Sequence, residues 1–308
     1  MMQGRKDMKV LVAIDDSGAS QYVISEAAAR PWPTGTVFCV QCVVDTWASD
    51  EMPELIEDAK RQAKSLVTAA TCVLSRSGYE VVSEIQAGVP KKAIVEYANN
   101  WGADLVMVGS HRSNAVARFL LGSVSRAVLR SALCSVEIVR PGPRALPASS
   151  PGMKIIVATD GSNCSQKAVH VIANRPWPPQ TLVRVISIRE PIAPESGTFF
   201  SYETLYPANL ADELLEREFL RAEDALTNAR NILNSAGLKL SDSSETLFGD
   251  PRNILLDEAT SWGADLVALG SHGRHGFDQV LLGSVSESVA VHAHCSVEVV
   301  RDNATAGE

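Results

Sequence analysis

The chain contains 308 residues, of which 45% are hydrophobic and 21% are charged, and its formal net charge is −8. This acidic balance argues against a general affinity for nucleic acid, whose phosphates would repel the protein. The sequence has no apolar run as long as a membrane span and no hydrophobic stretch behind its first residues, so we expect a cytoplasmic protein with no membrane partner.

The sequence is internally duplicated. Residues 9–45 align with residues 154–190, with 14 of 37 positions identical. Residues 84–140 align with residues 245–301, with 27 of 57 positions identical. The alignment offset rises from 145 to 161 between the two blocks, which places 16 extra residues in the second copy, inside 191–244. Two matching blocks in the same order indicate a tandem repeat.

The duplication predicts two domains of ordinary size, each able to bury a core of its own. We call residues 8–141 domain 1 and residues 153–302 domain 2. The tract 142–152 between them is rich in Pro, Ser and Gly and has no hydrophobic periodicity. It is predicted to be a linker.

Each copy opens on a near-continuous apolar run, 9–14 or 154–159. Such runs are typical of strands that are covered on both faces in a parallel sheet. Asp15 and Asp160 follow at the carboxyl ends of these strands.

A first helix is predicted next, over 20–30 or 165–175, with Ser17 or Ser162 as its N-cap. The motif Arg-Pro-Trp-Pro ends this helix in both copies. We interpret it as a helix stop with a packing tryptophan.

The remaining elements alternate between strand and helix. In chain order they are a strand at 36–44 or 181–188, a helix at 53–77 or 211–236, a strand before Gly88 or Gly249, a helix at 90–101 or 251–262, a strand at 104–108 or 265–269, a helix after a glycine loop, and a strand at 135–140 or 296–301. This order predicts an α/β fold with two doubly wound, parallel five-stranded sheets of Rossmann-like type. Ligands of such sheets bind beyond the carboxyl ends of the strands.

The glycine loop carries the strongest functional signal. In the second copy it contains Gly270-Ser271-His272-Gly273, nine further residues, and then Gly283-Ser284-Val285-Ser286, directly after an apolar strand. A strand that runs into a Gly-rich loop presents backbone N–H groups to a phosphate chain. The alternative is a tight turn that only joins strand to helix. The first copy has Gly109-Ser110-His111-Arg112 and then Gly122-Ser123-Val124-Ser125, with arginine in place of the second glycine.

Together these motifs resemble the universal stress protein family, and the chain is similar to a tandem member with two such domains. The resemblance rests on Val-Ala-x-Asp-x-Ser at the first strand, Gly-x-Pro before the third helix, Gly-Ala-Asp-Leu-Val, the glycine loop and the closing Cys-Ser-Val-Glu-x-Val, each present twice. It implies an adenine-nucleotide-binding fold, with ATP as the expected ligand and Mg²⁺ as its companion ion.

Site residues follow from the resemblance by position. It places Asp160 near the adenosine and Ile188 at the border of the adenine, and it places the glycine loop around the phosphates. The loop positions in domain 2 are Gly270, Gly273, Gly283, Ser284, Val285 and Ser286. A weaker site in domain 1 would use Asp15, Val43, Gly109, Gly122, Ser123 and Ser125.

Domain 1 departs from the family pattern at Arg112 and at Asp16, which stands where domain 2 has Gly161. If the second glycine of the loop needs a left-handed backbone, an arginine there costs about 1–2 kcal/mol. Its side chain would also fill the phosphate space. The opposite interpretation is that a guanidinium binds phosphates bidentately. We expect an impaired or altered first site.

Other motifs have simpler explanations. His111 and His272 lie inside the loops and could touch phosphate, but we interpret them as structural. Neither His292-x-His294-Cys295 nor Cys39-x-x-Cys42 has the geometry of a metal or redox site when it lies on a strand, so we predict packing roles. Six cysteines without clusters indicate reduced thiols. The aromatic segment 191–210 is either a partner or lid surface or a loop folded over its own domain.

Three functional hypotheses remain. We favour a stress-response protein that binds ATP in domain 2, is not an enzyme and acts through nucleotide-dependent partner interactions. The closing strands 134–140 and 295–301 are apolar edges that need cover. The resemblance implies that this strand pairs domains, so we expect an internal pseudo-dimer, with a homodimer of the full chain as a further expectation. The alternatives are a slow ATPase, and a nucleotide-independent module that binds another small ligand or a partner.

Overall fold

The computed structural model describes residues 7–46, 53–110, 121–141, 152–190, 208–273 and 282–301. The elements of domain 1 are β1 (Lys9–Ile14), α1 (Gly18–Ala29), β2 (Val37–Asp45), α2 (Pro53–Ser75), β3 (Glu80–Gly88), α3 (Pro90–Trp101), β4 (Leu105–Gly109), α4 (Ser123–Ser131) and β5 (Ser135–Val139). The elements of domain 2 are β6 (Lys154–Ala158), α5 (Asn163–Asn174), β7 (Leu182–Arg189), α7 (Ala208–Ser235), β8 (Lys239–Leu240), β9 (Glu245–Phe248), α8 (Pro251–Trp262), β10 (Leu266–Gly270), α9 (Ser284–His292) and β11 (Ser296–Val300).

All strands of the described chain lie in one sheet, in the order β3-β2-β1-β4-β5-β11-β10-β6-β7-β8, with β9 also paired to β7. Within each domain the strands are parallel and doubly wound, which confirms the predicted fold class. One detail differs from the prediction: the third strand of domain 2 is divided into β8 and β9. The closing strands pair as expected, β5 with β11 in antiparallel register, and this pairing joins the two sheets into one.

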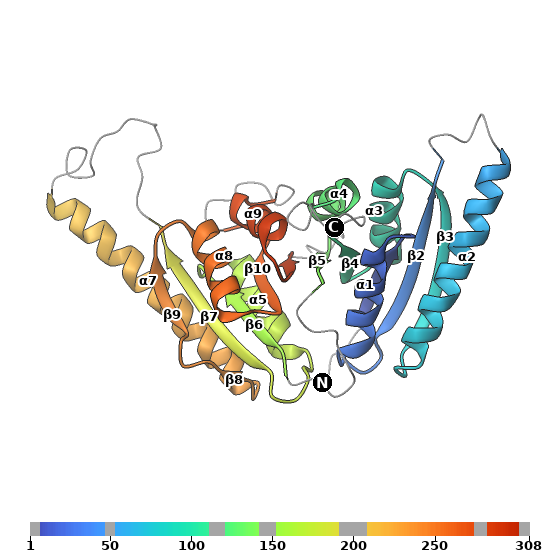
Figure 1. Ribbon diagram of the computed structural model, residues 1–308. Helices are drawn as coiled ribbons and strands as arrows, with labels where there is room; N and C mark the ends of the chain where they lie inside the picture. The colour runs from blue at the N-terminus through green and yellow to red at the C-terminus, as the bar shows by residue number, and fades with distance from the viewer. Residues whose placement is uncertain are drawn as a thin grey trace, which may run out of the picture.

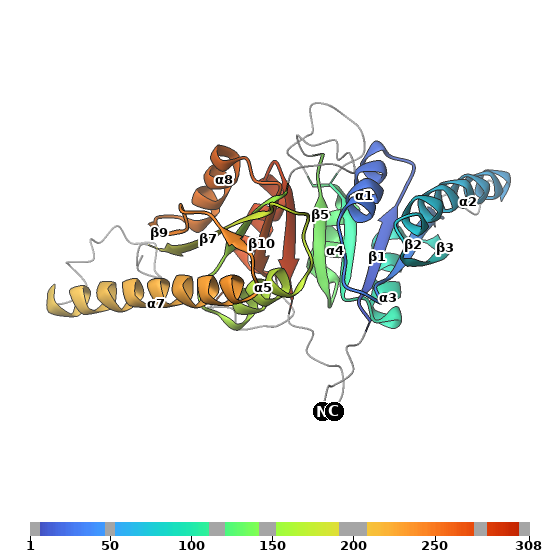
Figure 2. The same ribbon diagram turned by 90° about the horizontal axis from the view of Figure 1, so that it is seen from below.

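Helices cover both faces of this sheet. In each domain the first two helices contact each other on one face, α1 with α2 and α5 with α7, while α3 packs on α4 and α8 on α9 on the other face. Figure 1 shows α2 and α7 at the outer flanks and α4 and α9 next to each other near the middle. Figure 2, the view from below, shows α2 and α7 extending to opposite ends of the molecule. The helices that follow the two glycine loops therefore meet at the domain junction.

The predicted caps of the first helices differ between the domains. Ser162 caps α5 as expected, because its hydroxyl accepts a hydrogen bond from the backbone N–H of Ser165 at 3.3 Å. Ser17 occupies the N-cap position of α1 as predicted, but its side chain makes no capping hydrogen bond to the helix. Its hydroxyl instead donates to Asp15 Oδ1. The carboxylate at the end of β1 thus competes with the helix for the serine.

The core is continuous across the domain boundary. Val136 and Ile138 of β5 and Val297 and Val299 of β11 are each 0% exposed and belong to one apolar cluster, together with residues of α4 and α9. The closing strands thus supply each other's cover. Because apolar burial is the main favourable term in folding, this shared cluster holds the two domains together.

The junction also contains two buried ion pairs. Glu137 of β5 and Glu298 of β11 are direct partners in the antiparallel register, and both are 0% exposed. Arg30, at the end of α1, donates to both carboxylate oxygens of Glu137 at 2.6 Å. Arg175, at the end of α5, donates to Glu298 at 2.7 and 2.8 Å. Burial raises the pKa of Glu137 to about 7, although the Arg30 guanidinium acts against this rise.

The tryptophans of the two Arg-Pro-Trp-Pro motifs meet at the same place. Trp32 is buried and donates from Nε1 to the carbonyl of Ala27, as expected of a packing residue at a helix stop. The arginines of both domains face its ring, Arg30 at 5.1 Å and Arg175 at 5.8 Å. The motif therefore ends a helix and also links the two domains, which the sequence interpretation did not foresee.

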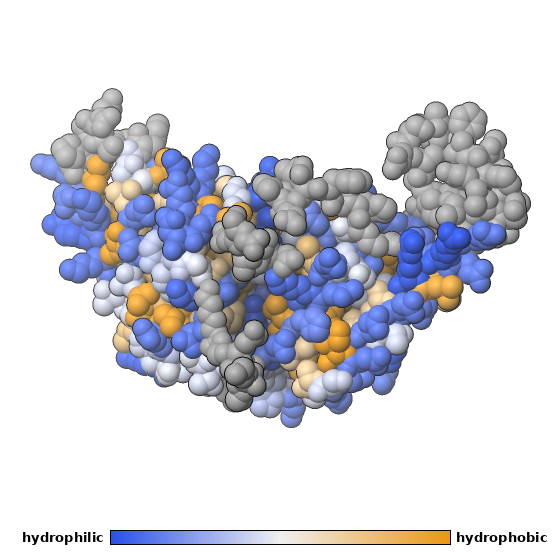
Figure 3. All heavy atoms as spheres, turned by 180° about the vertical axis from the view of Figure 1, so that it is seen from behind, coloured by the Kyte–Doolittle hydropathy of each residue, from blue (hydrophilic) through white to orange (hydrophobic). Residues whose placement is uncertain are grey.

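Figure 3 shows one outer face of the molecule, on which hydrophobic residues form small groups separated by hydrophilic side chains. None of the helices in the described part of the chain is both long enough and apolar enough to cross a membrane.

Candidate functional site

A cavity of about 400 Å³ lies at the carboxyl ends of β6, β7 and β10 in domain 2, beside the amino end of α9. All eight residues predicted for the second site line it. The lining residues are Ala158, Thr159, Asp160, Ser165, Ile186, Ile188, Glu190, Pro251, Leu255, Leu269, Gly270, His272, Gly273, Gly283, Ser284, Val285 and Ser286. The doubly wound topology thus brings together residues from four separate parts of domain 2 at the expected edge of the sheet.

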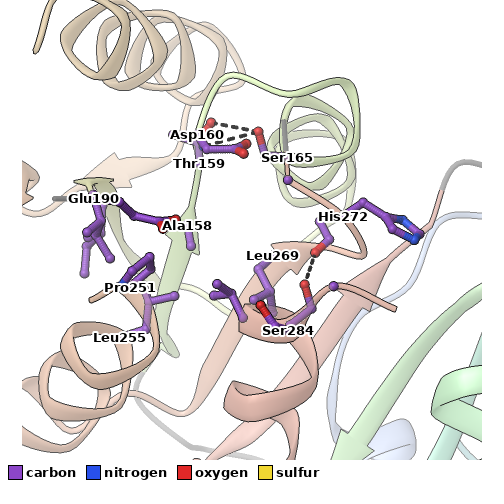
Figure 4. Close-up of a pocket in the computed structure, with 17 residues that line it drawn as sticks. Ala158, Thr159, Asp160, Ser165, Glu190, Pro251, Leu255, Leu269, His272 and Ser284 are labelled. Atoms are coloured by element: carbon purple, nitrogen blue, oxygen red, sulfur yellow. Dashed lines mark hydrogen bonds between the residues drawn. The ribbon is translucent and has the colours of Figure 1, made fainter. Parts of the chain in front are cut away.

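One side of the cavity is apolar. Ile186 and Ile188 come from β7, and Leu255 lies on α8, where it is 2% exposed. Figure 4 shows Pro251 and Leu255 on the same side as Glu190, with His272 on the other side. This surface suits a flat aromatic ring, because apolar walls favour ring burial while the carboxylate at one side can accept hydrogen bonds.

The opposite side is formed by backbone. Gly283 is the N-cap of α9, and Ser284 and Val285 are the first residues of that helix. The first N–H groups of a helix have no helical acceptor and lie at the positive end of its dipole. Because these residues line the cavity, this side can receive an anion.

The hydroxyl groups on this side have different roles. Ser286 donates its hydroxyl proton to the carbonyl of Gly270 at 2.6 Å. This hydroxyl proton is therefore used within the loop itself. The backbone N–H groups at the start of α9 supply the hydrogen-bond donors that the Ser286 hydroxyl does not.

Asp160 and Gly273 lie next to each other in the lining of the cavity. The backbone N–H of Ser162 donates to Asp160 Oδ1 at 3.0 Å. A Cβ atom on Gly273 would lie 2.9 Å from Asp160 Oδ2. Gly273 does not have a left-handed backbone, so the condition under which an arginine would strain the loop is not met in domain 2. The constraint at this position is the space in front of the carboxylate.

The loop after the first strand does differ in backbone conformation between the domains. Gly161 has a φ of +77°, in the left-handed region. Among the described non-glycine residues only Gln180 has positive φ, so Asp16 does not adopt the conformation of its counterpart. Asp15 Oδ1 accepts hydrogen bonds from the backbone and the hydroxyl of Ser17 and from Ser20 Oγ. The Asp15 carboxylate is thus bound by its own loop.

The ends of the glycine loop in domain 1 match those in domain 2. The N–H of Gly122 donates to the carbonyl of Ser110, and Ser125 Oγ donates to the carbonyl of Gly109 at 2.6 Å. Ser123 begins α4, and Val43 lies on β2 near its carboxyl end. Arg112 and His111, on which the expected difference between the sites depends, lie outside the described residues.

His272 lies between the cavity and the junction. Burial lowers its pKa, and the positive charge of Arg301 lowers it further. The imidazole is therefore neutral at pH 7. Its Nδ1 is 2.9 Å from Ser271 Oγ, while Nε2 is buried and has no hydrogen-bond partner among the residues that the structure describes. The loop position was predicted, but this neutral state was not.

The other histidines and cysteines are directed to separate partners. His292 Nδ1 lies 2.9 Å from the carbonyl of Ser288, and His294 Nδ1 lies 3.2 Å from Thr260 Oγ1. Cys295 is 0% exposed in the core. Cys39 and Cys42 are buried in β2, and burial raises the pKa of both thiols to about 11. These contacts agree with packing roles for the histidines and cysteines.

The aromatic segment was predicted at 191–210, and its residues 191–207 lie outside the described part of the chain.

Gly270 offers a first test of the loop's packing. A Cβ atom there would lie 2.7 Å from the backbone carbonyl carbon of Cys164 and the backbone nitrogen of Ser165 in α5. We expect Gly270→Ala to lower the free energy of unfolding by about 1–3 kcal/mol, because the strand and helix must separate. Gly109→Ala is the matched control. Its Cβ would meet only the methyl group of Ala19 within 3.0 Å. In denaturant unfolding, an equal or larger loss for Gly109→Ala would contradict this account.

Sequence reasoning missed part of the cavity. Glu190, Pro251 and Leu255 line it but were not predicted. Glu190 follows β7 directly, so the rule that ligands lie beyond strand ends could have found it. Leu255 is one of several apolar residues on α8, and only the packing of that helix shows which of them faces the cavity.

Comparison with known proteins places these features in one family. A profile described as the Universal stress protein family matches residues 8–140 and 153–301. The chain is 28% identical over 324 residues to the universal stress protein Rv2005c of Mycobacterium tuberculosis, which covers 98% of this chain and 100% of that protein. It is 31% identical over 137 residues to a putative universal stress protein of Staphylococcus epidermidis, which covers 42% of this chain and 82% of that protein. The solved structure of a universal stress protein from Archaeoglobus fulgidus superposes with a TM-score of 0.62 at 18% identity, covering 95% of this chain and 96% of that one.

Proposed function

The chain belongs to the universal stress protein family, and from this premise we propose that the cavity in domain 2 binds an adenine nucleotide, with ATP as the ligand. The observation that carries the proposal is the two-sided lining of the cavity. One side is an apolar surface formed by Ile186, Ile188 and Leu255, and the other is the amino end of α9. A nucleotide has the same division between an aromatic base and an anionic phosphate chain.

The glycines of the loop support the fit. A Cβ on Gly270 would clash with α5, one on Gly273 would reach Asp160, and one on Gly283 would lie 3.0 Å from the carbonyl of Ser271. Side chains at these positions would therefore close the cradle. With glycine, the backbone of α9 and its preceding loop can approach phosphate oxygens. Asp160, which lies beside Gly273, would accept hydrogen bonds from the ribose or the base.

We further propose that the protein responds to stress by nucleotide-dependent interaction with partners rather than by turnover. A slow ATPase would need a proton acceptor, and the lining residues with a side chain of that kind are Asp160, Glu190 and His272. Burial lowers the pKa of His272, which favours its neutral imidazole. Its Nδ1 contacts Ser271, which fixes the ring in the loop. This contact favours a structural role, and hydrolysis stays the alternative.

A charge placed at the start of α9 tests the site. Ser284→Glu introduces a carboxylate at the first position of the helix, inside the cavity. It should weaken binding of ATP with Mg²⁺ by more than about 100-fold, because like charges a few ångströms apart repel strongly in a partly buried site. The fold should tolerate it, since acidic residues stabilise the first turn of a helix.

Ser123→Glu is the matched control, because Ser123 begins α4 in domain 1 in the same way. Calorimetric titration should show near wild-type binding in this variant and loss in Ser284→Glu, with similar melting temperatures. Equal binding in both variants would refute the proposed site, and loss only in Ser123→Glu would move the site to domain 1.

A further inference from the structure

Helix α9 is held at its carboxyl end by the other domain. Arg140, which follows β5 in domain 1, donates from Nη2 to the carbonyl oxygens of Ala290 at 3.0 Å and Val291 at 2.7 Å. These carbonyls belong to the last turn of α9, where a helix has acceptors without helical partners and the negative end of its dipole. Arg140 is only 4% exposed. Domain 1 thus supplies a charged, buried cap that domain 2 does not provide for itself.

A second contact reaches the first turn of the same helix. Arg130 of α4 donates from Nε to Glu287 Oε1 at 3.0 Å. Glu287 follows directly after the α9 residues 284–286 that line the cavity. Figure 1 shows α4 and α9 adjacent at the junction. Because the Arg130 side chain is 55% exposed, this pair is weakened by solvent, and Arg140 is the stronger of the two contacts.

We propose that Arg140 is a positioning residue for the nucleotide site of domain 2, an inference that rests on the proposed function. Arg140 does not line the cavity and acts through α9. This helix has nine residues, so it moves as one rigid element, and a shift of its carboxyl end also displaces its amino end. The N–H groups at that amino end must keep their positions to within about 0.5 Å to bind an anion well. Binding in domain 2 therefore depends on an arginine of domain 1.

The pseudo-symmetry of the junction provides a matched control. Arg301, which follows β11, donates from Nη2 to the carbonyls of Leu129 at 2.8 Å and Arg130 at 3.2 Å, at the end of α4. It is 5% exposed. Arg140 and Arg301 therefore have the same chemistry and burial but cap different helices. Comparing them separates a general loss of junction stability from a specific effect on the domain 2 site.

Titration of full-length variants tests the inference. Arg140→Leu is expected to weaken binding of ATP with Mg²⁺ about tenfold, within the usual range of coupling between sites. At pH 8 His272 is neutral with or without the nearby charge of Arg301, so Arg301→Leu should change the affinity by less than about twofold, although both variants should melt at similarly reduced temperatures. Arg140→Lys should recover most of the affinity, since an ammonium group also donates to the last carbonyls of a helix. No loss in Arg140→Leu, or an equal loss in Arg301→Leu, would overturn the positioning role.

Hydrogen exchange of the ligand-free proteins separates this inference from the proposed function. Arg140→Leu should speed exchange of backbone amides in 284–292, and Arg301→Leu should do so in 123–131. If the wild-type protein binds no ATP, the proposed function fails, and the exchange pattern still decides whether Arg140 orders α9. Unchanged exchange throughout α9 in Arg140→Leu would overturn the inference by itself.

Discussion

Replacing Glu298 with alanine should lower the free energy of unfolding by about 3–5 kcal/mol, the usual cost of leaving one charge of a buried ion pair without its partner. Both carboxylate oxygens of Glu298 accept hydrogen bonds from Arg175, and the side chains of the pair are 0% and 9% exposed. Truncation would leave the guanidinium buried without this carboxylate. Denaturant unfolding at pH 8, followed by tryptophan fluorescence, measures the effect, because Trp32 lies 5.8 Å from Arg175.

Two further variants control this prediction. Glu137→Ala should cost less, because Arg30 keeps its ion pair with Glu26 at 3.1 Å. Glu298→Gln should also cost less than alanine, because an amide oxygen still accepts one hydrogen bond. If Glu298→Ala unfolds at the wild-type denaturant concentration, the buried pair does not stabilise the junction and this account of it fails.

Gly273→Arg should abolish measurable binding of ATP while leaving the fold intact. Its Cβ atom would take the space in front of Asp160 Oδ2, and the remaining side chain would extend from a residue that lines the cavity. Since Gly273 has no left-handed backbone, the substitution adds no conformational strain, and the melting temperature should change by only a few degrees, about what 1 kcal/mol produces in a chain of this size.

The effect of Gly273→Arg has two components, the Cβ atom beside Asp160 and the rest of the arginine side chain. Gly273→Ala separates them. Alanine brings only the Cβ contact with the Asp160 carboxylate, so the affinity should fall by an intermediate amount, about tenfold. If Gly273→Arg binds ATP as well as the wild-type protein does, the phosphate end of the site lies elsewhere. Binding tighter than wild type would show that an arginine at this position acts as a phosphate ligand.

The order of elements and the position of the cavity could be predicted because both follow from local patterns. The apolar runs that end at Asp15 and Asp160 determine where the strands stop, and parallel strands bring their carboxyl ends to one edge. The glycine loop occurs twice with the same spacing, so the start of α9 at Ser284 could be located closely. These features depend on residues close together in the sequence.

What could not be predicted depends on contacts between distant residues. Glu137 and Glu298 are acidic residues in apolar closing strands, and such residues need a buried partner. The repeated Arg-Pro-Trp-Pro motif contains the arginines that supply it, but nothing local connects residues more than 100 positions apart. The acidic residues of the closing strands and the arginines of the repeated motif together could have predicted these ion pairs. We interpreted each feature separately.

The backbone conformation of the glycines and the hydrogen bonds of the serine hydroxyls could not be predicted from the sequence either. The sequence has glycine at 161, directly after Asp160, and at 273 in the glycine loop, yet only Gly161 has positive φ. Likewise, Ser162 caps its helix while Ser17 donates to Asp15. In each case one residue type has two uses of similar free energy, and the surrounding loop decides between them.

The number of ATP molecules bound per chain is the most direct test of the central claim, that the two repeats differ and domain 2 holds the nucleotide site. The measurement is calorimetric titration of ATP with Mg²⁺ into the intact protein, after removal of any nucleotide carried through purification. This account predicts one molecule per chain, and none in Gly273→Arg. Two molecules per chain, or one that persists in Gly273→Arg, would contradict it.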